Sequence, residues 1–278
     1  MRIRRGMRDA VWFISAISVA VTAIPVIFIL YYGFFVYNDA AKYGSTILMS
    51  IALTLFSSGI ASLVIFTVFT PLSYELSRRS HVIWETVSDI PASIPHPIVG
   101  IAFLIIGSPI TPLGRFLSSI GFGLFDSVQG LILALSFIAM PVYIRSAQSV
   151  FTSRSIEPEL YALSMGASRI RILYSVVVPG SLREVISAIL TSMSRAMSEF
   201  GSIAILSYYV LQYPFRGVQP APVLIYQYYG YYGPGVAISA SAIMIIFSLI
   251  VLVVIRVISL RGRAHTDSGP EKLLRGGF

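Results

Sequence analysis

The sequence has no cysteine and few charged residues. Asp, Glu, Lys and Arg make up 12% of its 278 residues, whereas soluble domains average about 25%. Hydrophobic residues make up 56%. The absence of cysteine excludes disulfides, thiolate catalysis and cysteine-ligated metal in this chain. The low charge and the long apolar runs together predict an all-α polytopic membrane protein.

Motifs for ATP binding and for common hydrolases are also absent. A phosphate-binding loop needs Gly-Lys followed by Ser or Thr, but the two lysines, Lys42 and Lys272, follow Ala and Glu. Neither Gly-x-Ser-x-Gly nor His-Glu-x-x-His occurs. We therefore expect no catalytic residue, no bound cofactor and no metal in this chain, and an intramembrane enzyme finds no nucleophile–base pair. If ATP drives the protein, ATP and Mg²⁺ are expected on another subunit.

Six apolar segments are each close to the roughly 20 residues that a helix needs to cross a bilayer. We predict transmembrane helices at 10–37, 45–70, 90–110, 127–144, 184–209 and 233–258. The first segment is longer than the apolar region of a signal peptide and lacks a small-residue cleavage site, so we interpret it as a span.

The positive charges indicate how these spans are oriented. Sixteen of the 20 Lys and Arg residues lie in segments that are inside when the N-terminus is cytoplasmic, whereas Lys42, Arg115 and Arg216 lie outside. This is the positive-inside pattern of membrane proteins. We predict a multi-pass protein of the cell membrane with both termini in the cytoplasm. The net charge of +8 then records orientation, and we expect lipid rather than nucleic acid as a partner.

The third span begins with three prolines, Pro91, Pro95 and Pro97. Proline fixes φ and removes a backbone donor. This entrance is therefore predicted to be broken or re-entrant, which membranes tolerate only beside protein or a water-filled cavity. His96 lies among the prolines, and we interpret it as a packed polar residue rather than a ligand.

The fifth span carries hydroxyl residues at helical spacing. They recur every three or four residues from Ser187 to Ser202 and therefore share one helical stripe. Arg195 and Glu199 lie at its edge as an i, i+4 pair, and each charge facing lipid would cost about 2.5–3.5 kcal/mol. One interpretation is a structural ion pair with small residues for helix packing. The other is a translocation pathway or gate that consists of Ser194, Arg195, Ser198, Glu199 and Ser202.

Between the fourth and fifth spans lies a regular polar stretch, EPELYALSMGASRIRILYSVVVPG at 157–180. Gly166 predicts a turn, and Pro179-Gly180 predicts the end of a helix. A short amphipathic helix, a glycine turn and a second short helix fit these signals. We interpret 157–179 as a cytoplasmic docking element for another protein and term it the docking segment.

The remaining segments give a simple domain division. Residues 207–235, between the last two spans, are dense in Tyr and Pro and fit either an aromatic belt at the membrane interface or an outer gate. We predict an N-terminal arm, first span and outer loop at 1–44, and a core of five spans at 45–260. A basic cytoplasmic tail follows at 261–278.

The docking segment resembles the cytoplasmic EAA signature of ABC importer permeases, in which a Gly is followed after nine residues by an aliphatic, any residue, an aliphatic and Pro. After Gly166 these positions hold Val176, Val178 and Pro179. The leading Glu-Ala-Ala corresponds to residues 160–162, Leu-Tyr-Ala, and a Glu stands one place earlier, at 159.

Other stretches resemble the molybdate, tungstate and sulfate branch of that family. MSEFGSIAIL at 197–206 is similar to its GEFG motif. IPASIPHPIVGIAFL at 90–104 resembles its proline-rich third span, and APVLIY at 221–226 resembles its outer loop. The resemblance covers about residues 45–260.

The resemblance implies a homodimer of permeases that imports an oxyanion by alternating access. Tungstate or molybdate is the first candidate, and sulfate or another small solute is the alternative. It also implies an extracellular substrate-binding protein and an ABC ATPase subunit that holds ATP and Mg²⁺. The coupling helix and its turn would contact that ATPase through Glu159, Leu160, Tyr161, Ala162, Met165, Gly166, Ala167, Ser168 and Pro179.

Two further expectations follow. A dianion crossing the pore meets only Arg195 as a mid-membrane cation, so we expect it to bind weakly. The alternative from another class is an ion-driven transporter or channel without an ATPase. Such a protein needs coupling carboxylates within its spans, and Glu199 is the clear candidate.

Overall fold

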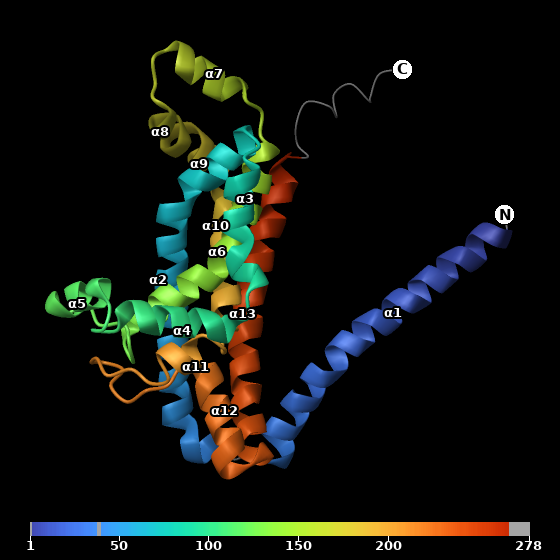
Figure 1. The fold of residues 1–278 in the computed structure, drawn as a ribbon. Helices are drawn as coiled ribbons and strands as arrows, with labels where there is room; N and C mark the ends of the chain where they lie inside the picture. Colours follow the sequence, from blue (N-terminus) through green and yellow to red (C-terminus); the bar gives the residue numbers. More distant parts are fainter. Residues whose placement is uncertain (1, 38–39, 267–278) are drawn as a thin grey trace. The chain divides into compact units, whose positions relative to one another are not determined.

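The computed structural model describes residues 2–37 and 40–266, with side chains described at 11–37 and 43–257, and most of that length is helical (Figure 1). An isolated bridge pairs Val210 with Val218. The chain divides into two compact units: residues 1–48 with 224–249 form unit 1, and residues 49–223 with 250–278 form unit 2. Unit 1 thus joins the first span to the start of the last.

Unit 1 is held by small and aromatic residues. It contains α1 (Arg2–Tyr31), the π-helical η1 (Tyr32–Val36), the start of α2 (Ala40–Arg78), most of α12 (Ala221–Tyr232) and the first part of α13 (Pro234–Thr266). Gly33 approaches α13 so closely that a Cβ there would lie 2.5 Å from the Cβ of Ala242. The rings of Tyr43, Tyr228 and Tyr232 pack against one another. The apolar window of the first span is not buried within the described residues, so its surface is available to lipid.

Unit 2 is built around α6 (Val128–Thr152), which packs against α10 (Leu182–Met197) and α3 (Val82–Ser93). Tyr143 and Phe151 of α6 are fully buried. The hydroxyl of Tyr143 lies 2.6 Å from that of Thr70 on α2. Buried serines of α2, such as Ser58, donate to carbonyls one turn earlier in the same helix. These hydroxyls are satisfied without water, as a helix in a membrane requires.

Two spans are bent pairs of helices. The helix α3 meets α4 (His96–Gly107) at 102°. At that bend Ile94 is extended and Pro95 precedes the first turn of α4, where the missing N–H of Pro97 has no intrahelical partner to lose. As a result, α4 and the following α5 (Pro112–Ser119) lie across the direction of α2 (Figure 1).

The second bend precedes α10. The chain runs through α7 (Glu157–Ser164), α8 (Arg169–Ile172), the π-helical η2 (Leu173–Val177) and α9 (Val178–Gly180), and then turns 89° into α10. After α10 a turn leads into the short α11 (Ile203–Leu206), which packs on α4. Both bent spans therefore meet around α4 and the end of α10.

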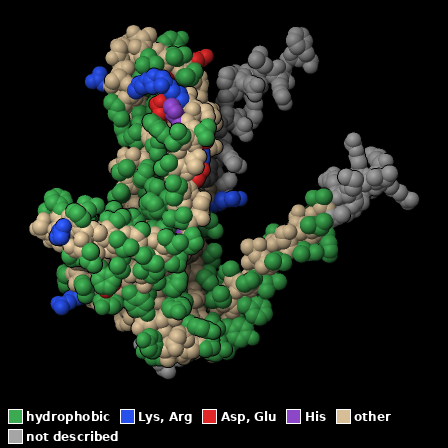
Figure 2. Space-filling view, viewed as in Figure 1, with side chains coloured by type: hydrophobic (Ala, Val, Ile, Leu, Met, Phe, Trp, Pro, Cys, Tyr) green, Lys and Arg blue, Asp and Glu red, His purple; other side chains and the backbone are tan. Residues whose placement is uncertain are grey.

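Charge is concentrated at the α7 end of unit 2. On the face shown in Figure 2, charged side chains gather at that end, whereas hydrophobic side chains cover most of the rest of the unit. The charged group includes Glu75, which lies 3.7 Å from Arg79, from His81 and from Arg169. A charged end beside an apolar surface is the distribution expected of a membrane protein.

The structure confirms the all-α membrane fold, with corrections to the spans. Four described helices are long and apolar enough to cross a membrane, and the two bent pairs raise the number to six. The second and fourth spans continue past 70 and 144, to Arg78 and Thr152. The third begins at Val82, ahead of the prolines that bend it. The helix of the fifth span, predicted to reach 209, ends at Met197.

Some sequence expectations concern residues beyond this description. Residues 267–278 of the predicted tail lie outside the described residues, and the side chains of the N-terminal arginines and Lys42 are not described either. The division at 44 and 260 stays a prediction. The boundary between the compact units at 48 lies close to the first of these positions.

Candidate functional site

The docking segment folds, as predicted, into a helix, a glycine turn and a second helix. Pro158 occupies the first turn of α7, where proline is favoured. Gly166 has a φ of +80°, a conformation that glycine adopts without strain. The N–H of Ala167 donates to the carbonyl of Ala162 at 3.0 Å and closes the end of α7. Local sequence signals thus determine the shape of this segment.

The docking segment exposes apolar side chains. Leu160, Tyr161 and Met165 are 53%, 72% and 81% exposed, and Ile170 on α8 is 55% exposed. Grouped apolar residues on a short exposed segment are typical of a protein–protein contact. Because this end of unit 2 is charged (Figure 2), these side chains are better suited to a protein partner than to lipid.

The nine predicted docking residues do not all lie on that surface. The exposed ones are Leu160, Tyr161, Met165, Gly166, Ser168 and Pro179, while Ala167 is half-buried and both Ala162 and Glu159 are buried. Pro179 belongs to α9, next to the bend into α10, and is therefore separate from the turn at Gly166.

Glu159 points into the protein and anchors α7. Its carboxylate lies 2.5 Å from Arg78 Nη2 and accepts a 2.6 Å hydrogen bond from the hydroxyl of Tyr74. Arg78 Nη1 also donates to the carbonyl of Phe151 at 2.8 Å. Only 5% of Glu159 is exposed. The ion pair therefore ties the docking segment to the ends of α2 and α6, and Glu159 is not available for direct contact with a partner.

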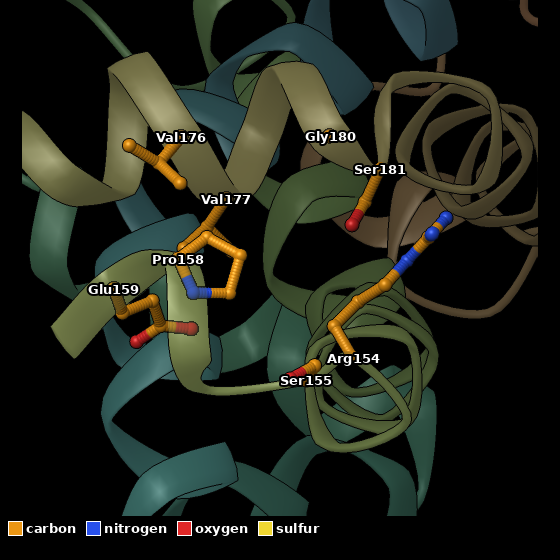
Figure 3. A pocket seen from close by; sticks show the side chains of 8 residues that line it. All are labelled: Arg154, Ser155, Pro158, Glu159, Val176, Val177, Gly180 and Ser181. Carbon is orange, nitrogen blue, oxygen red and sulfur yellow. The ribbon is translucent and has the colours of Figure 1, made fainter. Parts of the chain in front are cut away.

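Two cavities flank this anchor. One, of about 240 Å³, lies between α7 and the bend before α10, with Pro158, Val176 and Val177 in its wall and Arg154 and Ser181 across from Glu159 (Figure 3). The other, of about 200 Å³, lies between α7 and α2. Glu159 lines both. Between these two cavities, the ion pair of Glu159 with Arg78 connects α7 to α2.

The predicted Arg195–Glu199 pair is present and has a third member. Arg195 Nη1 lies 3.5 Å from Glu199 Oε2, and His96 Nδ1 lies 2.8 Å from the same oxygen. Arg195 Nη2 lies 3.0 Å from His96 Nε2. We term these three residues the polar cluster. Glu199 is 1% exposed, whereas the side chains of Arg195 and His96 are 29% and 31% exposed. The carboxylate thus lies behind two nitrogen-bearing side chains.

A tight turn after α10 holds Glu199 in place. Its Oε1 accepts two hydrogen bonds of 2.9 Å, from the N–H and the hydroxyl of Ser202. A Cβ at Gly201 would lie 3.1 Å from that of His96, and a Cβ at Gly100 would lie 2.5 Å from the carbonyl oxygen of Ser202. The sequence Glu-Phe-Gly-Ser at 199–202 therefore packs directly against the start of α4.

The single hydroxyl stripe predicted for the fifth span is wrong in its second half, because α10 ends at Met197. Ser194 is half-buried on the helix, as the stripe requires. Ser198 is exposed, and its hydroxyl donates to the carbonyl of Arg195. Ser202 is buried against Glu199. Of the predicted pathway residues, Ser194, Arg195 and Ser198 reach a surface of unit 2.

Sequence reasoning missed the role of His96. It is a packed polar residue, as expected, but its Nδ1 also lies 2.8 Å from a carboxylate oxygen of Glu199, which is distant in the sequence. One signal was present. A polar side chain between prolines at a break in a span needs a partner, because the surrounding membrane offers none.

A further buried carboxylate, Asp126, lies in the loop between α5 and α6. It is 3% exposed and has a φ of 45°. Burial raises the pKa of its carboxyl group, while hydrogen bonds from the backbone N–H groups of Tyr208 and Tyr209 oppose that shift. Its backbone pairs with Leu206 and Leu211. Asp126 therefore joins the loop before α6 to the segment after α11.

Comparison with known proteins identifies relatives over most of the chain. The profile of the family described as "Binding-protein-dependent transport system inner membrane component" matches residues 68–263. The molybdate/tungstate transport system permease protein WtpB of Pyrococcus furiosus is 28% identical over 78% of this chain and 80% of that protein. WtpB of Pyrococcus abyssi is 31% identical over 67% of this chain and 68% of that protein.

Two other comparisons extend this result. The sulfate transport system permease protein CysT of Synechocystis is 27% identical over 66% of this chain and 63% of that protein. A solved chain of the inward-facing MetNI methionine ABC transporter matches with a TM-score of 0.51 and 18% identity, covering 81% of this chain and 94% of that chain. At that identity the match establishes a shared fold.

Proposed function

The chain belongs to the family of binding-protein-dependent transport system inner membrane components, and we propose that it is the permease for tungstate or molybdate. It is a multi-pass permease subunit of an ABC importer. The observation that carries the choice of cargo is the 28–31% identity with molybdate/tungstate permeases over 67–78% of the chain. Sulfate is the second candidate, because a sulfate permease is 27% identical over 66% of it.

A separate ATPase subunit supplies the energy in this proposal and holds ATP and Mg²⁺. Two observations support it. The chain has no phosphate-binding loop of its own, and its docking segment exposes Leu160, Tyr161 and Met165 at a charged end of unit 2. The proposed ATPase contact consists of these side chains and the turn at Gly166, Ala167 and Ser168.

The anchor of α7 provides a route for coupling. When the ATPase subunits close, they displace the docking segment, and the pair of Glu159 with Arg78 pulls on the end of α2. Arg78 also donates to the carbonyl of Phe151 at the end of α6. The same displacement is therefore transmitted to α6. Alternating access then requires these helices to move relative to the bent spans that end at the polar cluster.

The remaining partners follow from the same proposal. Two copies of the chain form the pathway between them, with Ser194, Arg195, Ser198, Glu199 and Ser202 near it. An extracellular binding protein delivers the anion. The chain spans the cell membrane, and both of its termini lie in the cytoplasm. The positive-inside pattern of the sequence supports this orientation.

Uptake of labelled oxyanions by the reconstituted complex tests the proposal. Proteoliposomes containing the permease, its ATPase and its binding protein should accumulate tungstate or molybdate only when ATP is present on the ATPase side. Preferential uptake of sulfate would show that sulfate, the second candidate, is the cargo. Uptake that persists without the ATPase subunit would contradict the importer and favour an ion-driven transporter.

A further inference from the structure

Arg195 has hydrogen-bonding capacity that its neighbours do not use. A guanidinium group carries five N–H donors. Within the described residues, one contact of Arg195 is short, the 3.0 Å approach of Nη2 to His96 Nε2. Its Nη1 makes only long contacts, 3.4 Å to Ser198 Oγ and 3.5 Å to Glu199 Oε2. The side chain is 29% exposed, so part of this donor group reaches the surface of unit 2.

Glu199 is too firmly held to satisfy these donors. Its Oε1 is bonded twice by Ser202, and its Oε2 lies 2.8 Å from His96 but accepts no well-directed hydrogen bond among the described residues. Good charge-assisted bonds measure about 2.7–2.9 Å, so the 3.5 Å contact with Arg195 is loose. The carboxylate neutralises Arg195 from behind and leaves its outer side open to a second anion.

The position of the cluster restricts what that anion is. It lies where the two bent spans meet, and a cation facing lipid there would be strongly unfavourable. The exposed side of Arg195 therefore faces water or protein in the assembled complex. Among the described residues, the ion-pair contacts of the cluster are those between its own members. The nearby helix α6 carries Arg145, which is instead paired with Asp89 and Glu85.

We propose that Arg195 directly contacts the transported tetrahedral oxyanion, that His96 positions Arg195, and that Glu199 keeps the affinity of this contact low. The inference rests on the proposed function and adds a mechanism to it. The oxygens of the anion accept from Arg195 as it passes. Glu199 acts as a resident anion that competes for the same cation, so the anion is released rather than trapped.

Tungstate binding to the permease–ATPase complex, without the binding protein, tests this role of Glu199. In Glu199→Gln the amide keeps the size of the side chain but removes the competing charge, so tungstate should bind about tenfold more tightly than to the unmodified complex. The double variant Glu199→Gln/Arg195→Gln should lose that gain. Arg115→Gln, which removes an exposed arginine of α5, should bind as the unmodified complex does. Equilibrium dialysis with elemental analysis gives the affinities.

A phospholipid phosphate offers Arg195 the same oxygens as the cargo. Nanodiscs of phosphatidylcholine, with and without phosphatidylglycerol, separate the two sources. We expect the same tungstate affinity in both. Loss of tungstate binding to Glu199→Gln when phosphatidylglycerol is present would assign Arg195 to a lipid headgroup and overturn the inference.

A second variant keeps the inference testable if Glu199→Gln does not assemble. Arg195→Lys retains the charge opposite Glu199 but not the planar set of donors, so tungstate uptake should fall while assembly is unchanged. Unchanged uptake would overturn the inference, as would a gain in affinity that survives Arg195→Gln. Either result would leave the proposed function as an ABC importer unaffected. Failure of the unmodified complex to take up any oxyanion would instead contradict the proposed function itself.

Discussion

At the scale of single residues, Glu159 and Glu199, both buried in unit 2, have different surroundings. Glu159 receives short, well-directed hydrogen bonds from Tyr74 and Arg78. In Glu199 one oxygen is bonded by Ser202, while the other lies near His96 and Arg195 without a directed bond. Glu159 is therefore suited to holding an element in place. Glu199 is suited to partly neutralising the positive charge of the half-exposed Arg195.

The burial of Asp126 predicts a pH-dependent loss of stability. Its raised pKa means that the group adds no penalty at low pH, where it is neutral in both folded and unfolded states, and destabilises the fold as pH rises through the folded-state pKa. Asp126→Asn should therefore raise the melting temperature at pH 7 and have little effect near pH 4. Thermal unfolding of the purified complex across that range measures the difference. An effect of Asp126→Asn on the melting temperature that is the same at every pH would contradict this account.

The close approach of α4 to the turn at 199–202 predicts that Gly100 cannot be enlarged. Gly100→Ala places a Cβ 2.5 Å from the backbone oxygen of Ser202, and overpacking of this kind costs about 1–3 kcal/mol. Gly59→Ala on α2 is the matched control, because a Cβ there meets nothing within 4 Å. Thermal unfolding in detergent should show a lower melting temperature for the first variant only. Equal melting temperatures would show that α4 adjusts at no cost.

At the scale of elements, α7 is held to unit 2 by Ala162, which is buried in the core, and by the ion pair of Glu159 with Arg78. Cavities lie on two sides of it, and Glu159 lines both. Its exposed side chains include Leu160 and Tyr161, and its buried Glu159 forms an ion pair with Arg78 of α2. An element attached in this way transmits a displacement through its anchor, so the anchor is the place where coupling is most easily broken.

Replacement of Arg78 should therefore uncouple transport from ATP hydrolysis. Arg78→Ala leaves Glu159 buried without its cation, and breaking a buried pair in this way costs about 3–5 kcal/mol. Arg79→Ala is the matched control, because the side chain of Arg79 is exposed and lies 3.7 Å from Glu75 without a close contact. Uptake and ATP hydrolysis are measured in the same proteoliposomes. In the Arg78 variant, less substrate should be taken up for each ATP hydrolysed. Normal coupling in Arg78→Ala would contradict the role of the anchor.

The elements differ in how well the sequence predicts them. The docking segment is predictable because Pro158 and Gly166 act within a few residues of their own positions. The end of α10 is not, because hydrophobic residues continue to Leu206, whereas the turn that follows α10 packs against the distant His96. For the same reason His96 is absent from the predicted site, although the Arg195–Glu199 pair is present in it.

At the scale of the whole molecule, hydropathy locates the spans but does not give their shapes, and the orientation inferred from the positive charges stays a prediction. The prolines at 91, 95 and 97 predict a broken third span, and the structure confirms it with a 102° bend. The 89° bend before α10 follows Pro179 and Gly180, which mark the end of a helix without giving the new direction. The roles of the docking residues and pathway residues stay predictions, because both depend on partners.

The coupling of tungstate import to ATP hydrolysis tests the central claim most directly. Uptake and hydrolysis are measured together in proteoliposomes containing the unmodified complex, the Gly166→Trp variant or a Gly121→Trp control. Both glycines have a positive φ and open surroundings, but only Gly166 lies on the docking segment. We predict ATP-dependent uptake in the unmodified and control complexes, and loss of uptake with Gly166→Trp. Tungstate uptake that continues in Gly166→Trp, or without any ATPase subunit, would contradict the account.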